Sequence, residues 1–273
     1  MTDPEKKPYI SPSQLGMFTR CGEQYRRRYV LGERLPPGVA ATRGTAVHKG
    51  AEENAKQKIT THVDLPVKDV VDIAANTFDE QVKHEGVWLS PEEIATGEKL
   101  VIGAAKDTAV SLAELMARES LPKFQPAEIE VTGRLEIPES SHDLLGRIDL
   151  IDEREIILDY KTSARAKSQA DVDGDDQFTM YDLLYRATKG KPPRGIIVEN
   201  LVSTKVPKVV TLATNRTLED SQVLINRINA MLIGLKMGSF MPAITGQWWC
   251  SAKFCGYAPT CKYINKRAPG GVS

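Results

Sequence analysis

The segment GRIDLIDEREIILDYKTS, residues 146–163, most constrains the fold, because it places charged side chains within two apolar strand patterns. Apolar residues flank the polar turn DERE on both sides, as expected for two β-strands that fold back on each other. Asp149 lies in the first strand, and Asp159 and Lys161 lie in the second. Residues i and i+2 share one face of a strand, so Asp159 and Lys161 point the same way while Tyr160 points away. We expect the turn to bring Asp149 close to that face.

Two carboxylates and a lysine at one place on a sheet predict a metal site. Like charges are costly to bury together unless a cation compensates them. Hard oxygen ligands favour Mg²⁺ or Mn²⁺. A lysine beside such an ion can orient or help to deprotonate a bound water, or neutralise charge in the transition state. A D-x-K triplet on its own is more often a surface ion pair, and this alternative stays open for Asp159 and Lys161.

Hydrophobic periodicity changes along the chain from helical to strand-like. Residues 1–120 carry mostly helical patterns, and SPSQLGMFTRCGEQYRRRYVLG is predicted as one helix with Ser11 or Ser13 as its cap. After Pro126, three strands precede a helix that Gly190 ends, and two more strands precede a long amphipathic helix. This order of elements favours an α/β fold.

The same order favours one domain over residues 1–273. Within it we expect a helical part over 1–120, a sheet-containing core over 121–240, and a cysteine-bearing tail over 241–273. The sequence contains no internal repeat and no long linker that would divide these parts.

The four cysteines divide into one and three. Cys21 lies near the N-terminus, and Cys250, Cys255 and Cys261 follow the pattern C-x4-C-x5-C near the other end. The polar start MTDPEKKPYI is no signal peptide and no apolar run could span a membrane, so we expect the cytosol, or a host cytoplasm if the chain is viral. Clustered cysteines there bind metal more often than they form disulfides. Buried thiols, a zinc site and an iron–sulfur cluster all remain open.

A nucleic-acid partner would need a local basic patch, because the formal net charge is zero. The segment YRRRYV supplies one, and we predict Arg27 and Arg28 within it as DNA-binding residues. The alternative is an ordinary solvated helix face.

The motif GRID…LDYK resembles the signature of the PD-(D/E)XK nucleases, and QFTMY resembles the Q-x-x-x-Y motif of their RecB-type branch. Gln177 and Tyr181 would share one helix face. GTAVHKGAEE resembles the G-x-x-x-H helix of that branch, whose histidine contributes to the metal site. The resemblance implies a restriction-endonuclease-like mixed β-sheet flanked by helices. It also implies a Mg²⁺ or Mn²⁺ site formed by His48, Asp149, Asp159 and the backbone carbonyl of Tyr160.

The segment SPSQLGMFTRCGEQY resembles S-x-S-x-L-x-x-F-x-x-C-P in nucleases that carry an iron–sulfur cluster. These are the AddB-type helicase-nucleases and the CRISPR-associated RecB-like exonucleases of the fourth Cas family. Gly22 replaces the usual proline, and the first gap of the cysteine tail is two residues longer than the usual C-x2-C-x5-C. The resemblance implies a C-terminal iron–sulfur tail with a 4Fe–4S cluster bound by Cys21, Cys250, Cys255 and Cys261.

The same resemblance implies a metal-dependent DNA exonuclease that acts on single-stranded DNA or duplex ends, often 5′ to 3′, in recombination, repair or CRISPR-type DNA processing. Catalysis would fall to His48, Asp149, Asp159 and Lys161, with Lys161 positioning the attacking water, while Gln177 and Tyr181 hold the strand. No G-x-x-x-x-G-K loop is present, so ATP is not expected to drive the reaction. Two alternatives stay open: a non-catalytic DNA-end-binding module with protein partners in recombination or CRISPR adaptation, and a structure-selective endonuclease.

Overall fold

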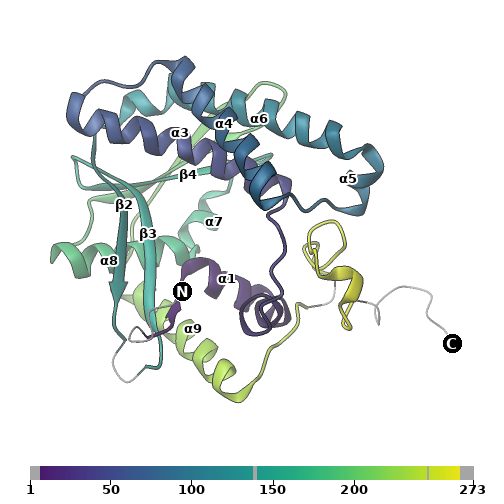
Figure 1. Ribbon diagram of the computed structural model, residues 1–273. Coiled ribbons are helices and arrows are strands. Elements are labelled where there is room, and N and C mark those ends of the chain that lie inside the picture. Colours follow the sequence, from purple (N-terminus) through teal and green to yellow (C-terminus); the bar gives the residue numbers. More distant parts are fainter. Residues whose placement is uncertain (1–6, 138–139, 245, 265–273) are drawn as a thin grey trace.

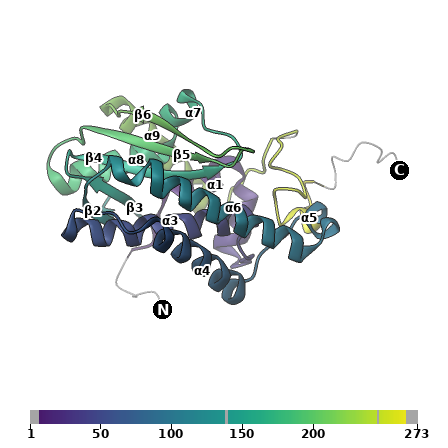
Figure 2. The ribbon, with the colours of Figure 1, turned by 90° about the horizontal axis from the view of Figure 1, so that it is seen from above.

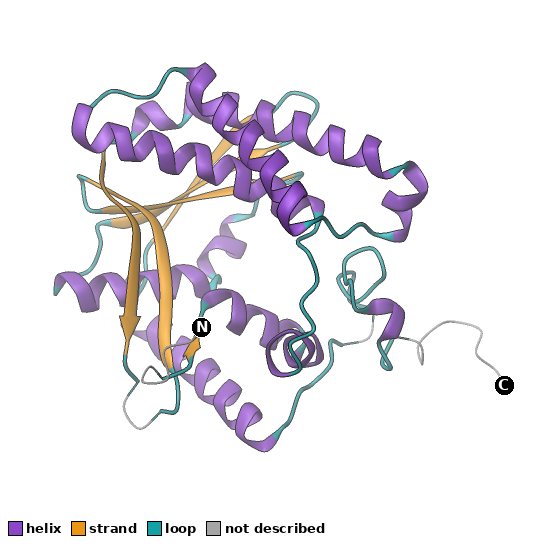
Figure 3. Cartoon of the chain, viewed as in Figure 1, coloured by secondary structure: helices purple, strands orange, loops and turns teal. Residues whose placement is uncertain are grey.

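A mixed β-sheet lies between two layers of helices in the computed structural model, which describes residues 7–137, 140–244 and 246–264 (Figures 1 and 3). The strand order is β1-β3-β4-β5-β6, with β2 paired to β3. β1 pairs with β3 and β4 with β5 in parallel, and the other pairs are antiparallel. The strands are β1 (Tyr9–Ile10), β2 (Pro126–Leu135), β3 (Asp143–Asp152), β4 (Ile156–Ser163), β5 (Gly195–Val202) and β6 (Lys208–Thr214).

The helices α3, α4 and α6 cover one face of the sheet, and α8 packs with α1 and α9 on the other (Figure 2). The helices are α1 (Pro12–Arg20), α2 (Gly22–Tyr25), the π-helix η1 (Arg26–Val30), α3 (Val39–Thr61), α4 (Val67–Glu85), α5 (Pro91–Thr96), α6 (Glu98–Glu119), η2 (Leu121–Lys123), α7 (Gln169–Asp173), α8 (Asp176–Lys189), α9 (Leu218–Met237) and η3 (Ala258–Thr260). These layers confirm the predicted α/β fold with a mixed sheet flanked by helices. None of these helices in the described part of the chain combines the length and apolar character needed to cross a membrane.

Local chemistry explains most helix ends. Ser11 accepts from the backbone N–H of Gln14 at the start of α1, and Thr217 forms a capping box at the start of α9. Gly190 ends α8 with a φ of 71°, which glycine adopts without steric cost.

The prediction of a single helix after Ser11 is wrong, because the helix is interrupted at Cys21. The backbone of Cys21 is extended, with φ −162° and ψ 100°, and its N–H closes α1 on Met17. The N–H of Gly22 donates to the carbonyl of Met241 at 2.7 Å instead of continuing the helix. A contact with the far end of the chain therefore replaces a helical turn that periodicity alone favours.

The break at Cys21 leads to a stability prediction for Gly22. A methyl group at this position would lie 2.8–2.9 Å from backbone atoms of Phe240 and Met241, which cannot move aside as a flexible side chain can. We expect Gly22→Ala to lower the free energy of unfolding by about 1–3 kcal/mol, as for other overpacked sites, measured by urea denaturation.

Gly16→Ala in α1 is the matched control, because an added methyl there meets nothing within 4 Å. It should be neutral or stabilising by up to about 1 kcal/mol, as expected for alanine in a helix. Equal stabilities of the two variants would contradict the close approach at Gly22.

Candidate active site

The predicted carboxylates lie where the ladder between β3 and β4 ends. The two strands pair at Leu150–Leu158 and Ile151–Ile157. Asp149 and Asp159 each lie one residue beyond the Leu150–Leu158 pair. They therefore stand together at the margin of the paired region, where helix α3 contacts one and helix α8 contacts the other.

On the α8 side, four of the predicted residues form a connected hydrogen-bond network. The Nζ of Lys161 lies 2.9 Å from Asp159 Oδ2 and donates to Gln177 Oε1 at 3.0 Å. The amide Nε2 of Gln177 donates to Asp159 Oδ1 at 3.0 Å and to the Tyr181 hydroxyl at 2.6 Å. The Q-x-x-x-Y residues thus reach the strand carboxylate from one face of α8, as their spacing predicted.

Burial dominates the electrostatics of this network. Asp159 is fully buried, and burial raises the pKa of its carboxyl group against the opposing effect of Lys161. Burial also disfavours the charged form of Lys161, but the attraction of Asp159 outweighs it and raises the pKa of the ammonium group. Asp159 depends on Lys161, because the carboxylate has no water to compensate its charge, while the Lys161 side chain stays 26% exposed.

On the α3 side, His48 faces Asp149. Its Nδ1 lies 3.2 Å from Asp149 Oδ2. Burial opposes charge on both groups, but their mutual attraction lowers the pKa of Asp149 and raises the pKa of His48. The buried ring of Tyr160 packs edge-on against the His48 ring, with centroids 6.4 Å apart. Tyr160 thereby supports the histidine, in addition to carrying the carbonyl predicted as a ligand.

Two carboxylate oxygens suit a hard cation. Asp149 Oδ2 and Asp159 Oδ2 are buried and accept no hydrogen bond from the described residues, although His48 and Lys161 lie within ion-pair distance. Such under-satisfied oxygens are the ligands that Mg²⁺ and Mn²⁺ prefer. Within the described ranges, however, no three His, Cys, Asp or Glu side chains are grouped closely enough to hold a metal ion as they stand. The histidine and the lysine supply the compensating positive charge instead.

Glu130 is a neighbour of this site that the sequence did not reveal. It lines a small cavity with His48, Asp149 and Glu52, and its carboxylate pairs with Arg147. Its φ of 51° is unusual for a non-glycine residue in a strand and marks a local distortion of β2. The segment EIEVTGRLEI alternates like a regular strand, so periodicity gave no signal of this distortion.

The structure does not bring Arg27 and Arg28 into the carboxylate network. Arg27 pairs with Glu33 at 2.6 Å, donates to the carbonyl of Tyr257 at 3.3 Å and lies 4.6 Å from the centre of the Tyr257 ring. Arg28 lies over the ring of Tyr29. Arg27 therefore links the N-terminal helices to the tail, and a DNA contact by either arginine stays a prediction.

The four cysteines gather around one cavity of about 20 Å³. Cys21 enters from the α1–α2 junction, and the other three enter from the tail. No disulfide joins them, although all four lie in the described part of the chain. Burial raises the pKa of the Cys255 thiol, and the other three cysteines add to this effect. The two ends of the chain thus bring their thiols to one place. Residues 265–273 of the predicted tail lie outside the described residues.

The opposite pKa shifts of two histidines provide a test of the α3 side. In metal-free protein, the pKa of His48 should lie above 6.5, because the combined attraction of Asp149 and Asp159 outweighs burial. His142, whose pKa burial lowers, should titrate below 6.5. The His48–Asp149 pair therefore contributes stability below pH 6.5 that is lost as the pH rises through the raised pKa of His48.

NMR titration of the imidazole resonances would measure both midpoints. Asp149→Asn should lower the His48 midpoint and leave that of His142 unchanged. A His48 midpoint at or below that of His142 would contradict the pairing.

Comparisons with known proteins identify the family of the chain. A family model described as the PD-(D/E)XK nuclease superfamily matches residues 9–262. The fold resembles that of a solved "putative exonuclease" from Eubacterium rectale, with a TM-score of 0.53 and 13% sequence identity over 98% of this chain and 94% of that chain. A second structure, SSO0001, aligns with 15% identity over 96% of this chain and 89% of that chain, but its TM-score of 0.46 supports no argument. No curated protein matches the chain.

Proposed function

This chain belongs to the PD-(D/E)XK nuclease superfamily, and on that premise we propose that it is a divalent-metal-dependent DNA exonuclease. The observation that carries the proposal is the meeting of Asp149, Asp159 and Lys161 at the margin of the β3–β4 ladder. A protein that only bound DNA would have no need for a fully buried carboxylate with two further, partly buried charges beside it, because such burial is costly.

Each residue of the site then has a role in phosphodiester hydrolysis. Asp149 and Asp159 would hold Mg²⁺ or Mn²⁺, together with His48 and the backbone carbonyl of Tyr160. When bound, the ion would stabilise charge on the phosphate and lower the pKa of a water molecule. Lys161 would orient the attacking water, whose oxygen bonds to phosphorus as the bond to the leaving oxygen breaks.

The polar residues of α8 complete the site. Gln177 already bridges Lys161 and Asp159 and holds the Tyr181 hydroxyl. In the proposal it keeps Lys161 in position, and Gln177 and Tyr181 contact the substrate strand. Single-stranded DNA and 5′ to 3′ direction are the preferences that the resemblance implies. Recombination, repair and CRISPR-type DNA processing are the corresponding settings.

A 4Fe–4S cluster bound by the four cysteines is part of the proposal. The support is that thiols from both ends of the chain share one cavity and that no disulfide joins them. The thiols do not lie close enough together in space to hold a single metal ion, since no three His, Cys, Asp or Glu side chains of the described residues do. A cluster requires four thiolates but tolerates irregular spacing in the sequence. Its role would be structural, joining the α1–α2 junction to the tail.

Cleavage assays with manganese test the enzyme proposal. End-labelled linear and circular single-stranded DNA are incubated with the wild type and with Asp159→Ala. We expect the wild type to degrade the linear strand, and Asp159→Ala to be slower by at least about a hundredfold, because a metal ligand is lost. Asp107→Ala is the matched control, because Asp107 is exposed on α6.

The outcomes separate the alternatives. Cutting of circles would favour the endonuclease, and binding of DNA ends without cleavage would favour the end-binding module. Absence of cleavage by the wild type would contradict the enzyme proposal, whether or not the protein binds DNA.

The cluster proposal has a separate test in Cys255→Ala. Because ligation contributes to folding free energy, this variant should lose iron, melt at a lower temperature and bind DNA more weakly before its cleavage rate at saturating DNA changes. Iron and sulfide analysis, thermal melts and visible absorption would measure these effects, with Ser251→Ala as the control in the same loop. A colourless wild-type protein that contains zinc, or a variant of full stability and unchanged metal content, would refute the cluster.

A further inference from the structure

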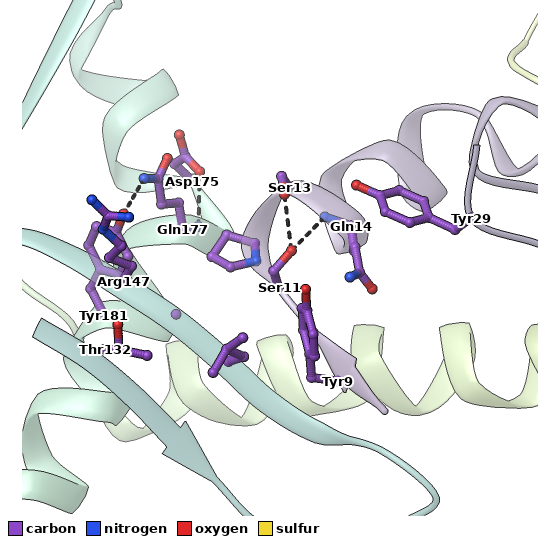
Figure 4. A pocket seen from close by; sticks show the side chains of 13 residues that line it. Tyr9, Ser11, Ser13, Gln14, Tyr29, Thr132, Arg147, Asp175, Gln177 and Tyr181 are labelled. Carbon is purple, nitrogen blue, oxygen red and sulfur yellow. Dashed lines mark hydrogen bonds between the residues drawn. The ribbon is translucent and has the colours of Figure 1, made fainter. Parts of the chain in front are cut away.

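A pocket of about 510 Å³ adjoins the proposed active site and has no role in the scheme above (Figure 4). Gln177 and Tyr181 form one of its walls, and through Gln177 this wall is hydrogen-bonded to Asp159 and Lys161. Its volume lies within the range of small-molecule and cofactor sites. A ligand in this pocket would therefore lie next to the reacting phosphate.

The two ends of the pocket differ in chemistry. Figure 4 shows Arg147, Gln177 and Tyr181 gathered at one end, and Tyr9, Gln14 and Tyr29 at the other. Among the described residues that line the pocket, Arg147 is the one cationic side chain. Arg147 pairs with Glu130 and Asp175 also lines the first end, so that end carries charges of both signs, whereas the opposite end suits an uncharged, planar group.

Gln14 is the unusual residue at the uncharged end. Only 8% of its surface is exposed, yet its amide makes no hydrogen bond with any described residue. The atoms of this amide are not among the fully buried unpartnered atoms of the described residues, so the amide faces the pocket and is open to a ligand that supplies both an acceptor and a donor. The edges of all four DNA bases carry a donor beside an acceptor.

Tyr9 supplies an aromatic surface at the same end. The residue is 42% exposed, and its ring contacts no other aromatic ring among the residues described. Tyr29 is less available, because it packs against Tyr25 with ring centroids 4.9 Å apart and lies under Arg28. Exposed tyrosines in such grooves stack on unpaired bases.

We propose that this pocket binds the nucleotide next to the scissile phosphate, with the Gln14 amide hydrogen-bonded to the base edge and the Tyr9 ring stacked on the base. The inference rests on the proposed nuclease function and adds to it a binding site for one base of the substrate strand. The base must be unpaired to enter, so the pocket selects a single strand or a frayed duplex end. Gln14 and Tyr9 bind the base in this scheme, and the reacting groups stay those of β3, β4 and α8.

An abasic scan tests the pocket. Fluorescein-labelled single-stranded oligonucleotides, each lacking one base at a different position from the end, are bound to the protein in EDTA and followed by fluorescence anisotropy. For the wild type, loss of the base at one position should weaken binding by about tenfold, and the other positions should have smaller effects. Gln14→Met, which removes the amide at similar volume, should bind the intact strand about tenfold more weakly.

The decisive measurement combines the abasic oligonucleotides with the protein variants. In Gln14→Met and in Tyr9→Ala, removal of the base at the sensitive position should weaken DNA binding much less than it does in the wild type, because the contacts to that base are already missing. Tyr9→Phe should retain the position-specific pattern, since it keeps the ring. Gln222→Met, on the exposed surface of α9, is the matched control and should bind like the wild type. Thermal melts of every variant separate loss of contact from loss of folding.

Equal sensitivity at every abasic position, or a folded Gln14→Met protein that binds like the wild type, would overturn the pocket assignment even if the protein still cleaves DNA. A wild type that neither binds nor cleaves the intact strand would overturn the nuclease proposal as well, so the two failures are distinguishable.

Discussion

The buried ion pair between Asp159 and Lys161 is the interaction on which the candidate site depends. Removing both charges from water costs several kcal/mol per ion, and only short contacts of good geometry recover that cost. Asp159 is fully buried, and Gln177 contacts both members of the pair. Helix α8 must therefore dock on β2 and β3 in one register, because a displaced Gln177 would leave both charges with one partner fewer. The same docking places Tyr181 and the adjoining pocket beside the carboxylates.

The second constraint is the meeting of the two chain ends. The hydrogen bond from Gly22 to Met241, the contacts of Arg27 with Tyr257 and the shared cysteine cavity all join the first helices to the tail. These contacts end α1 at Cys21 and turn the thiol toward the other three cysteines. They also position η1, whose Tyr29 lines the pocket beside the active site. The tail thus helps to position one wall of the pocket beside the candidate site without contributing a side chain to the carboxylate network.

Much of the site could be predicted from sequence because its residues lie at fixed spacings on regular elements. Asp159 and Lys161 share a strand face, and Gln177 and Tyr181 share a helix face, so local geometry is enough to align them. Glu130 and Gln14 could not be found in this way. Glu130 depends on a distortion within β2, and Gln14 matters because its amide faces the pocket beside the site. Both properties arise from packing against residues distant in sequence.

By itself, the sequence determined the order of helices and strands, most of the caps and the faces on which the charged residues lie. These features depend on periodicity and on side-chain hydrogen bonds within a few residues. Only the tertiary structure decided where the first helix breaks, which positive group compensates each carboxylate, and that Arg27 is bound to the tail. Those outcomes are set by burial and by contacts between distant segments, whose free energies exceed the weak local preferences for continuing a helix or exposing a charge.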